Sequence, residues 1–280
     1  MSLKGVSDYL RPRTVEEAFA ALGASSRPLG GGTALILHSP PGLSTLVDLR
    51  DLPLDYIRTG DGFRIGATTT LTAMEEHPDL ASHLAGVFPE MLRHVGSPLL
   101  RNAATIGGHL ARGRLSDVIP VLLALDATVT VYDGISRTIT LEDFYRAGIH
   151  ERLMLITEIG VPPARPRSAA AFVKLSRTFY DLAMLNCACR VDLDEEGTVA
   201  AARVVVGETP ALGAPVAPAA AALLGTSFGP ADDEAAAAAA AGAIEFGSDS
   251  RASADYRAAL CRAAVTRCLA VVRSRLGGAS

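Results

Sequence analysis

Two clusters of glycine and threonine are the residues in this sequence best suited to bind a ligand. The first is Gly30-Gly31-Gly32-Thr33, and the second is Thr105-Ile106-Gly107-Gly108. Glycine adopts positive φ and lets the backbone approach a ligand closely, so two such loops brought together direct several N–H groups at a pyrophosphate, with threonine hydroxyls as further donors. Each cluster alone is also typical of a tight turn. The presence of both favours a dinucleotide-binding site.

The spacing within these clusters departs from the common nucleotide-binding motifs. The first cluster does not read G-x-G-x-x-G, because Leu35 stands three residues after Gly32. Neither cluster contains the Gly-Lys-Ser/Thr of a P-loop. The sequence has no H-E-x-x-H pair, and its 6 histidines are scattered, so a metallohydrolase is disfavoured.

Two polar residues near the second cluster are further candidates. His109 directly follows Gly108 and either contacts the ligand or is an ordinary surface or core residue. Asp117 precedes an apolar helical segment, so its carboxylate either caps that helix or accepts a hydrogen bond from a ribose or from the polar edge of a flavin.

The 4 cysteines are expected to be ordinary packing residues, with no metal site. Cys187 and Cys189 alternate with Ala188 in a strand-like run, and Cys261 and Cys268 stand one heptad apart. None has the C-x-x-C spacing of a zinc or iron–sulfur site, and free cysteine is commonly buried.

Composition narrows the class of protein. The chain has 280 residues, of which 49% are hydrophobic and 20% charged, which predicts a folded protein with one large domain or two to three small ones. The net charge of −4 and the lack of a basic block argue against a nucleic-acid surface. The longest apolar runs fall far short of the roughly 20 residues of a membrane span. Residues 1–5 lack the apolar core of a signal peptide, so a soluble, cytoplasmic protein is expected.

The N-terminal half is predicted to supply the elements that hold the glycine loops. Thr14 and Glu17 are spaced as a capping box that opens a helix, and the first glycine cluster is expected between a strand and a short helix. Asp133-Gly134 is a strong hairpin turn. Further strands are predicted at 46–49, 63–67, 128–132, 137–141 and 154–161, and further helices over 34–37, 70–75, 84–95 and 118–125.

The C-terminal part is predicted to form a small antiparallel sheet with helices. A proline-rich linker at 162–167 precedes it. Frequent hairpin signals and short strands favour an α+β class over a doubly wound parallel sheet. The strands are expected at 171–175, 188–193 and 199–206, and the helices from 232 onward and over 253–273. A domain boundary is therefore expected at this linker.

The order of several segments resembles the FAD-binding subunit of the molybdenum hydroxylases, the family that includes the medium subunit of carbon monoxide dehydrogenase and the flavin domain of xanthine dehydrogenase. The likeness covers nearly the whole chain, and 101–108 is its most specific piece. The segments that carry it are 29–33, 65–69, 101–108, 116–117, 120–127, 172–177, 181–183 and 253–257.

This resemblance implies a PCMH-type FAD-binding fold, shared with vanillyl-alcohol oxidase, in which FAD lies between two N-terminal α+β subdomains and a C-terminal domain of a sheet and helices. It places the two FAD-binding subdomains at 1–56 and 57–163 and the C-terminal domain at 168–277. Asp117 stands where the family has an acidic FAD contact, and Lys174 either contacts the flavin or is a strand residue with an exposed amino group. The residues implied to cradle the pyrophosphate are Pro28, Leu29, Gly30, Gly31, Gly32, Thr33, Ala34 and Leu35 with Thr105, Ile106, Gly107, Gly108 and His109, and Val95 and Ile156 match further flavin contacts.

The implied activity is electron transfer through FAD. The flavin performs the redox chemistry, so no catalytic acid–base pair is assigned to the chain. By resemblance, electrons arrive from a [2Fe–2S] small subunit and a molybdopterin large subunit, and leave to NAD⁺, a quinone or oxygen. The cysteines are not clustered as iron–sulfur ligands, so both centres are expected in separate subunits.

Three departures from the family leave two other functions open. Ala34 stands where aspartate is common, His109 replaces a frequent asparagine, and the loop at 111–117 is shorter than usual and lacks a Ser-Pro pair. The altered loop is compatible with a stand-alone flavin oxidoreductase that acts on its own small substrate. The same changes are compatible with an assembly or ligand-binding module that has lost FAD.

Overall fold

The computed structural model describes residues 5–209 and 212–277. The chain divides into two compact units, and each unit is built from three segments that are not contiguous in the sequence. Unit 1 consists of Met1–Glu76, Ser97–Gly113 and Ala127–Pro162, and unit 2 consists of His77–Gly96, Arg114–Asp126 and Pro163–Ser280. The two candidate glycine loops therefore belong to unit 1.

A small parallel sheet opens unit 1. It has the order β1 (Asp8–Leu10), β3 (Thr45–Asp48), β2 (Ser26–Leu29), with both outer strands parallel to β3. The helix α1 (Val15–Ala20) begins as predicted, because the Thr14 hydroxyl accepts the Glu17 N–H at 3.1 Å. Ala18 of this helix belongs to the same buried cluster as Val47 of β3.

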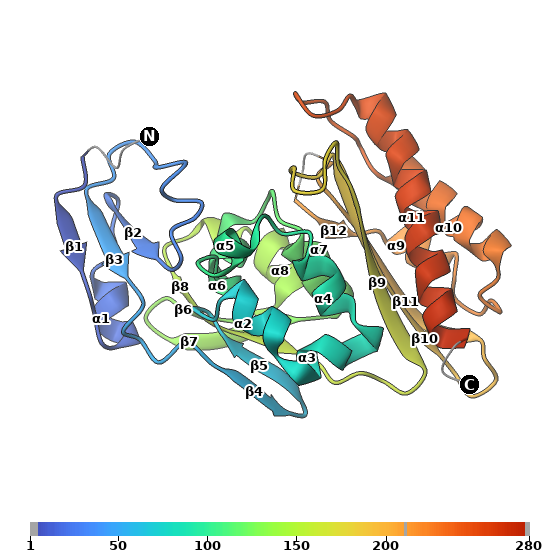
Figure 1. Ribbon diagram of the computed structural model, residues 1–280, viewed down its shortest axis with the longest axis horizontal. Helices are drawn as coiled ribbons and strands as arrows, with labels where there is room; N and C mark the ends of the chain where they lie inside the picture. Colours follow the sequence, from blue (N-terminus) through green and yellow to red (C-terminus); the bar gives the residue numbers. More distant parts are fainter. Residues whose placement is uncertain (1–4, 210–211, 278–280) are drawn as a thin grey trace. The chain divides into compact units, whose positions relative to one another are not determined.

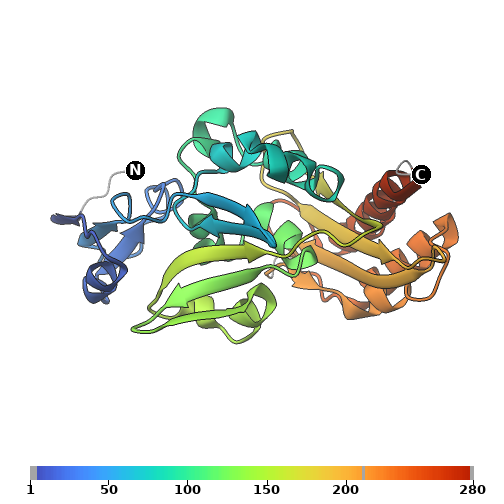
Figure 2. The ribbon, with the colours of Figure 1, turned by 90° about the horizontal axis from the view of Figure 1, so that it is seen from below.

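The second sheet of unit 1 is antiparallel throughout, in the order β4-β5-β8-β6-β7 (Figure 2). The predicted Asp133-Gly134 hairpin joins β6 to β7. In β6 the valines at 129 and 131 are buried while Thr128 and Thr130, which alternate with them, are half exposed, as expected of a strand. The bounds are β4 (Ile57–Gly60), β5 (Gly62–Gly66), β6 (Thr128–Tyr132), β7 (Ser136–Thr140) and β8 (Leu155–Val161), with α2 (Leu71–Glu76), α5 (Pro98–Arg101), α6 (Ile106–Arg112), α8 (Leu141–Arg146) and the 3₁₀ turn η2 (Ile149–Glu151).

Unit 2 is an antiparallel sheet with helices on both faces, as the sequence predicted for its C-terminal part. The strand order is β12-β11-β10-β9, and β10 is buried over eight successive residues, so neither of its faces meets solvent there. The long helix α11 packs on β9 and β10 (Figure 1), whereas α7 packs on β10 and β11. The bounds are β9 (Ser168–Leu175), β10 (Leu185–Leu193), β11 (Val199–Gly207), β12 (Ala214–Pro215), α3 (Pro78–Ser82), η1 (His83–Ala85), α4 (Val87–Leu92), α7 (Val118–Ala124), α9 (Ala217–Ala221), α10 (Pro230–Ala243) and α11 (Ala254–Gly277).

Two predicted helices differ from the structure. Residues 34–37 form hydrogen-bonded turns in place of a short helix, with the Ile36 N–H donating to Gly32 O at 3.0 Å. The helix predicted over 84–95 is divided, because Leu84 and Gly86 have φ of 46° and 87° and a right-handed helix cannot pass through such residues. Among the helices in the described ranges, none combines the length and apolarity needed to cross a membrane.

Arg257 on α11 is fully buried and fixes the start of that helix. Its guanidinium donates to the carbonyls of Met184, Gly247 and Ala252 at 2.7–2.9 Å, and to the Asp249 carboxylate at 2.6 Å. These bonds satisfy the buried Met184 carbonyl and tie the start of α11 to residues 247–252.

We expect Arg257→Met to destabilise unit 2 by about 1–3 kcal/mol, since it leaves the buried Met184 carbonyl without a donor, whereas Asp249 keeps its partner Arg251. The measurement is the free energy of unfolding in urea. Arg262→Met, on the exposed side of the same helix, is the control and should change the value by less than about 0.5 kcal/mol. A similar effect of the two substitutions would contradict a structural role for Arg257.

Candidate functional site

The glycine loop after β2 presents a row of unpaired main-chain donors. The N–H groups of residues 30–35 donate to no acceptor within the described part of the chain. Gly30 is exposed and the residues after it are only half buried, so the row is open to a ligand. Successive N–H groups without protein acceptors form a concave anion-binding site. The loop is therefore suited to hold a phosphate group without any lysine or arginine.

The second glycine loop lies directly against the first, as the sequence predicted. A Cβ atom at Gly31 would stand 1.5 Å from the carbonyl oxygen of Ala103, and one at Gly30 would stand 2.8 Å from Thr105 Oγ1. Only glycine permits such an approach of main chain to main chain. Gly32 also has a φ of 70°, which side chains rarely tolerate. The first loop is thus shaped by its contact with residues 103–105.

The N–H groups of the second loop, in contrast, are used inside the protein. Thr105 caps α6 by accepting the Gly108 N–H at 3.2 Å. The N–H groups of Ile106 and Gly107 donate to the carbonyls of Thr69 and Ala67 at 3.0 and 2.9 Å. The sequence suggested both loops as sources of N–H donors, whereas the structure leaves the donors of the first loop free and gives the second loop a shaping role.

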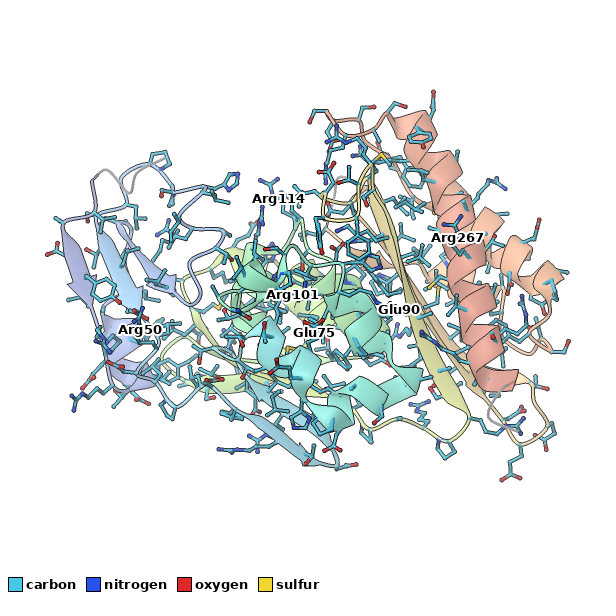
Figure 3. The ribbon with its side chains drawn as sticks, in the orientation of Figure 1. Arg50, Glu75, Glu90, Arg101, Arg114 and Arg267 are labelled. Atoms are coloured by element: carbon cyan, nitrogen blue, oxygen red, sulfur yellow. The ribbon has the colours of Figure 1, made fainter. Side chains whose placement is uncertain are left out.

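An ion pair holds the second loop in place. Arg101 of α5 is buried and donates to Glu75 of α2 at 2.8 Å (Figure 3). Gly107 packs so closely on Ala67 that a Cβ there would stand 2.7 Å from the Ala67 carbonyl oxygen. The segment between these two contacts carries Ala103, against which the first loop packs.

His109 and Ile156 are the remaining predicted site residues of unit 1. His109 lies on α6, where burial and the nearby charge of Arg112 lower its pKa from 6.5 to about 4. The imidazole is therefore neutral at pH 7 and brings no positive charge to an anion. Ile156 is a buried residue of β8.

In unit 2, Asp117 and Lys174 form a buried ion pair. Lys174 Nζ donates to Asp117 Oδ2 and to the His94 carbonyl, both at 2.8 Å, and the lysine side chain is only 2% exposed. Asp117 makes no capping bond to α7, and the Ser116 hydroxyl accepts the Val118 N–H instead. The sequence had left open a capping role for Asp117 and an exposed amino group for Lys174, and neither is present.

The ion pair continues into a buried polar network that the sequence did not reveal. Asn186 on β10 donates to Asp117 Oδ1 at 2.9 Å. Glu208 accepts the Ser116 N–H at 3.3 Å and is itself paired with Arg251 at 2.8 Å. Burial raises the pKa of Glu208, against the opposing effect of Arg251. The sequence signal for this network is Asn186, the polar residue in the otherwise apolar run 182–189. Val95, the last predicted site residue, is buried in unit 2.

Comparison with known families identifies both parts of the chain. The model of the FAD binding domain in molybdopterin dehydrogenase matches residues 4–164. The model of the CO dehydrogenase flavoprotein C-terminal domain matches residues 170–272. Fold and family together define an FAD-dependent oxidoreductase component of the predicted α+β, PCMH-type class. More closely, the chain belongs to the family of FAD-binding domains of molybdopterin dehydrogenases.

Individual relatives agree with this assignment. The nicotinate dehydrogenase FAD-subunit of Eubacterium barkeri is 30% identical over 68% of this chain and 70% of that relative. The carbon monoxide dehydrogenase medium chain of Hydrogenophaga pseudoflava is 29% identical over 94% of this chain and 95% of that relative. A solved structure of carbon monoxide dehydrogenase from the same organism matches with a TM-score of 0.88 at 29% identity, covering 96% of this chain and 97% of that one. FAD is thus the cofactor of the chain's family, as predicted.

The glycine loop fits this cofactor. FAD carries a diphosphate, and a row of N–H groups without protein acceptors is complementary to its oxygens. Gly31 packs against Ala103 without donating a hydrogen bond, so the N–H groups of the row keep no protein acceptor. The residues present therefore fit a diphosphate, and no basic side chain belongs to the loop.

The Asp117–Lys174 pair gives a testable measure of the buried network. We expect Lys174→Met and Asp117→Asn each to destabilise the protein by about 3 kcal/mol, because each leaves the partner charge buried and unpaired. In the double variant the loss should fall at least about 1.5 kcal/mol short of the sum of the single losses. Urea unfolding of the four proteins gives this coupling.

The control cycle uses Arg177 and Asp181, an ion pair whose side chains are 61% and 28% exposed. Its coupling should stay below about 1 kcal/mol. Equal coupling in the two cycles would show that burial does not strengthen the Asp117–Lys174 pair.

Proposed function

We propose that this chain is the flavin subunit of an oxidoreductase complex and that the main-chain N–H groups of residues 30–35 bind the diphosphate of its FAD. The observation that carries the proposal is the row of N–H groups that have no acceptor in the described chain. Residues 28–35 and 105–109 contain no lysine or arginine, so the anion is recognised by main-chain dipoles. The Thr33 hydroxyl is a further donor beside the row.

The other predicted residues have supporting roles in this proposal. Thr105 and Gly108 form the turn against which the glycine loop rests, and neutral His109 lies one residue further on. Asp117 accepts a hydrogen bond from a polar group of FAD, while Lys174 and Asn186 fix the orientation of its carboxylate. Ile156 and Val95 supply apolar surface. Bound FAD supplies the redox chemistry, and the chain's residues bind and orient it.

The proposed partners are an iron–sulfur small subunit and a molybdopterin large subunit. The support is the match over 95% of a carbon monoxide dehydrogenase medium chain, whose name places it in a complex of several chains. In this complex electrons enter the flavin from the iron–sulfur partner and leave to NAD⁺, a quinone or oxygen.

A negative charge introduced at position 33 tests the diphosphate site. Thr33→Glu places a carboxylate beside the N–H row, so we expect it to weaken FAD binding at least tenfold by repulsion of the diphosphate. Thr33→Gln has nearly the same size without the charge and should stay within about threefold of the native chain. The measurement is titration of the FAD-free protein with FAD, followed by flavin fluorescence.

Circular dichroism on the two variants shows whether both remain folded. Equal affinity in Thr33→Glu and Thr33→Gln would place the diphosphate elsewhere. A native chain that binds no FAD, either alone or with its partners, would favour the assembly-module alternative.

Electron entry is tested separately from FAD binding. The iron–sulfur subunit is reduced with dithionite, freed of excess reductant and mixed anaerobically with the FAD-loaded chain. We expect the flavin absorbance to bleach within seconds, and to return on addition of the one acceptor that the complex uses, among NAD⁺, a quinone and oxygen. An FAD-loaded chain that ignores the reduced partner but oxidises a small substrate unaided would instead be a stand-alone oxidoreductase.

A further inference from the structure

Three of the four cysteines meet inside unit 2. Cys187 and Cys189 lie two residues apart on β10, so their side chains point to the same face of the sheet. Cys268 projects from α11, which packs on that strand. The three Sγ atoms all lie within 4.8 Å of one another, and those of Cys187 and Cys189 are 3.7 Å apart. All three residues are fully buried free thiols, as is Cys261 one heptad away.

The size of this triangle suits one thiophilic ion. The centre of an equilateral triangle with sides of 3.7–4.8 Å lies about 2.1–2.8 Å from each corner, which spans the metal–thiolate distance of about 2.3 Å. Sulfur ligands select soft ions over hard ones. Within the described part of the chain, the cluster contains no histidine or carboxylate as a fourth ligand. A three-coordinate ion therefore fits better than a tetrahedral one.

The surroundings restrict the charge of the ion. The three cysteines belong to a buried cluster of alanine, valine and leucine side chains. Glu90, whose negative charge acts on Cys268, is paired with Arg275 at 3.1 Å. Arg275 is therefore not available to neutralise a negative charge at the cysteines. An uncompensated charge is costly in such a core. Three thiolates would keep a net charge of −1 with Zn²⁺ and −2 with Cu⁺, whereas a trivalent ion leaves none.

We propose that Cys187, Cys189 and Cys268 form a binding site for a trivalent thiophilic metalloid, which reaches the site as a neutral trihydroxide such as arsenous acid. Three As–S bonds form while three As–O and three S–H bonds break. Each thiol proton leaves with one hydroxide as water, so three waters are released and arsenic stays trivalent. Cys268 Sγ donates to the Ala171 carbonyl at 3.2 Å, as only a thiol can, so the cluster starts from three thiols. Reactants and product are then all uncharged, and no proton is gained from or lost to the solvent.

The bound ion would join β10 to α11 covalently. Because all three sulfurs are buried, entry requires a transient opening of α11, and the ion then stabilises the closed form. Slow uptake and a raised melting temperature are the physical signs of this arrangement. The site is independent of the FAD proposal, since its thiols take no part in binding the diphosphate.

The test uses the full reduced chain incubated with sodium arsenite in urea below the unfolding midpoint, which accelerates helix opening. We expect one arsenic per chain after gel filtration, three sulfur neighbours by X-ray absorption, and no proton release in weakly buffered solution. Cys187→Ala, Cys189→Ala and Cys268→Ala should each weaken binding at least 100-fold and abolish the rise in melting temperature. Cys261→Ala removes an equally buried thiol from the same helix and should behave as the native chain.

Several results would overturn the proposal. These are no arsenic retained by the native chain, two sulfur neighbours in place of three, or unchanged binding in Cys268→Ala when circular dichroism shows that variant to be folded. Zn²⁺ is offered under the same conditions as a divalent probe. If Zn²⁺ binds more tightly than arsenite and releases protons, the assignment of a trivalent ligand is wrong.

Discussion

The close approach of Gly31 to the carbonyl of Ala103 is the contact on which the candidate cofactor site depends. It is made by shape alone, with no hydrogen bond between the two residues. A loop held by hydrogen bonds would have used its own N–H groups, as the turn at 105–108 does. A loop held by steric fit keeps them free for a ligand. The Arg101–Glu75 ion pair beside this contact fixes the segment that carries Ala103.

Unit 2 meets a different constraint, the cost of burying charge. Lys174 and Arg257 are almost completely buried, and each has both a carboxylate partner and a carbonyl acceptor. Such pairs contribute little net stability compared with apolar residues, but the loss of one partner is costly. The network around Asp117 is therefore best understood as fixing orientation. It holds a carboxylate in one position at the start of α7, where an exposed aspartate would sample several rotamers.

Local patterns predicted the elements well, whereas distant contacts decided the site. The Thr14 cap and the Asp133-Gly134 hairpin depend on neighbouring residues and are present as predicted. The helix expected at 34–37 is instead a series of turns, which follow a loop packed on residues 103–105. The composition of the two glycine loops predicted that they meet. It could not predict that the N–H groups of the second loop are used inside the protein, because their acceptors are the distant carbonyls of residues 67 and 69. The three cysteines likewise come from a strand and a helix that lie about 80 residues apart, a separation that local spacing rules for metal ligands do not cover.

Recognition by main-chain groups also explains why departures from the family pattern are compatible with the proposed site. Ala34 replaces a common aspartate, yet its N–H belongs to the unpaired row whatever side chain it carries. His109 replaces a frequent asparagine, and its lowered pKa keeps it neutral, as asparagine is. A site built from lysine or arginine would depend on those side chains being present. A site built from backbone dipoles depends instead on glycines that permit close packing, and Gly30, Gly31 and Gly32 are all retained.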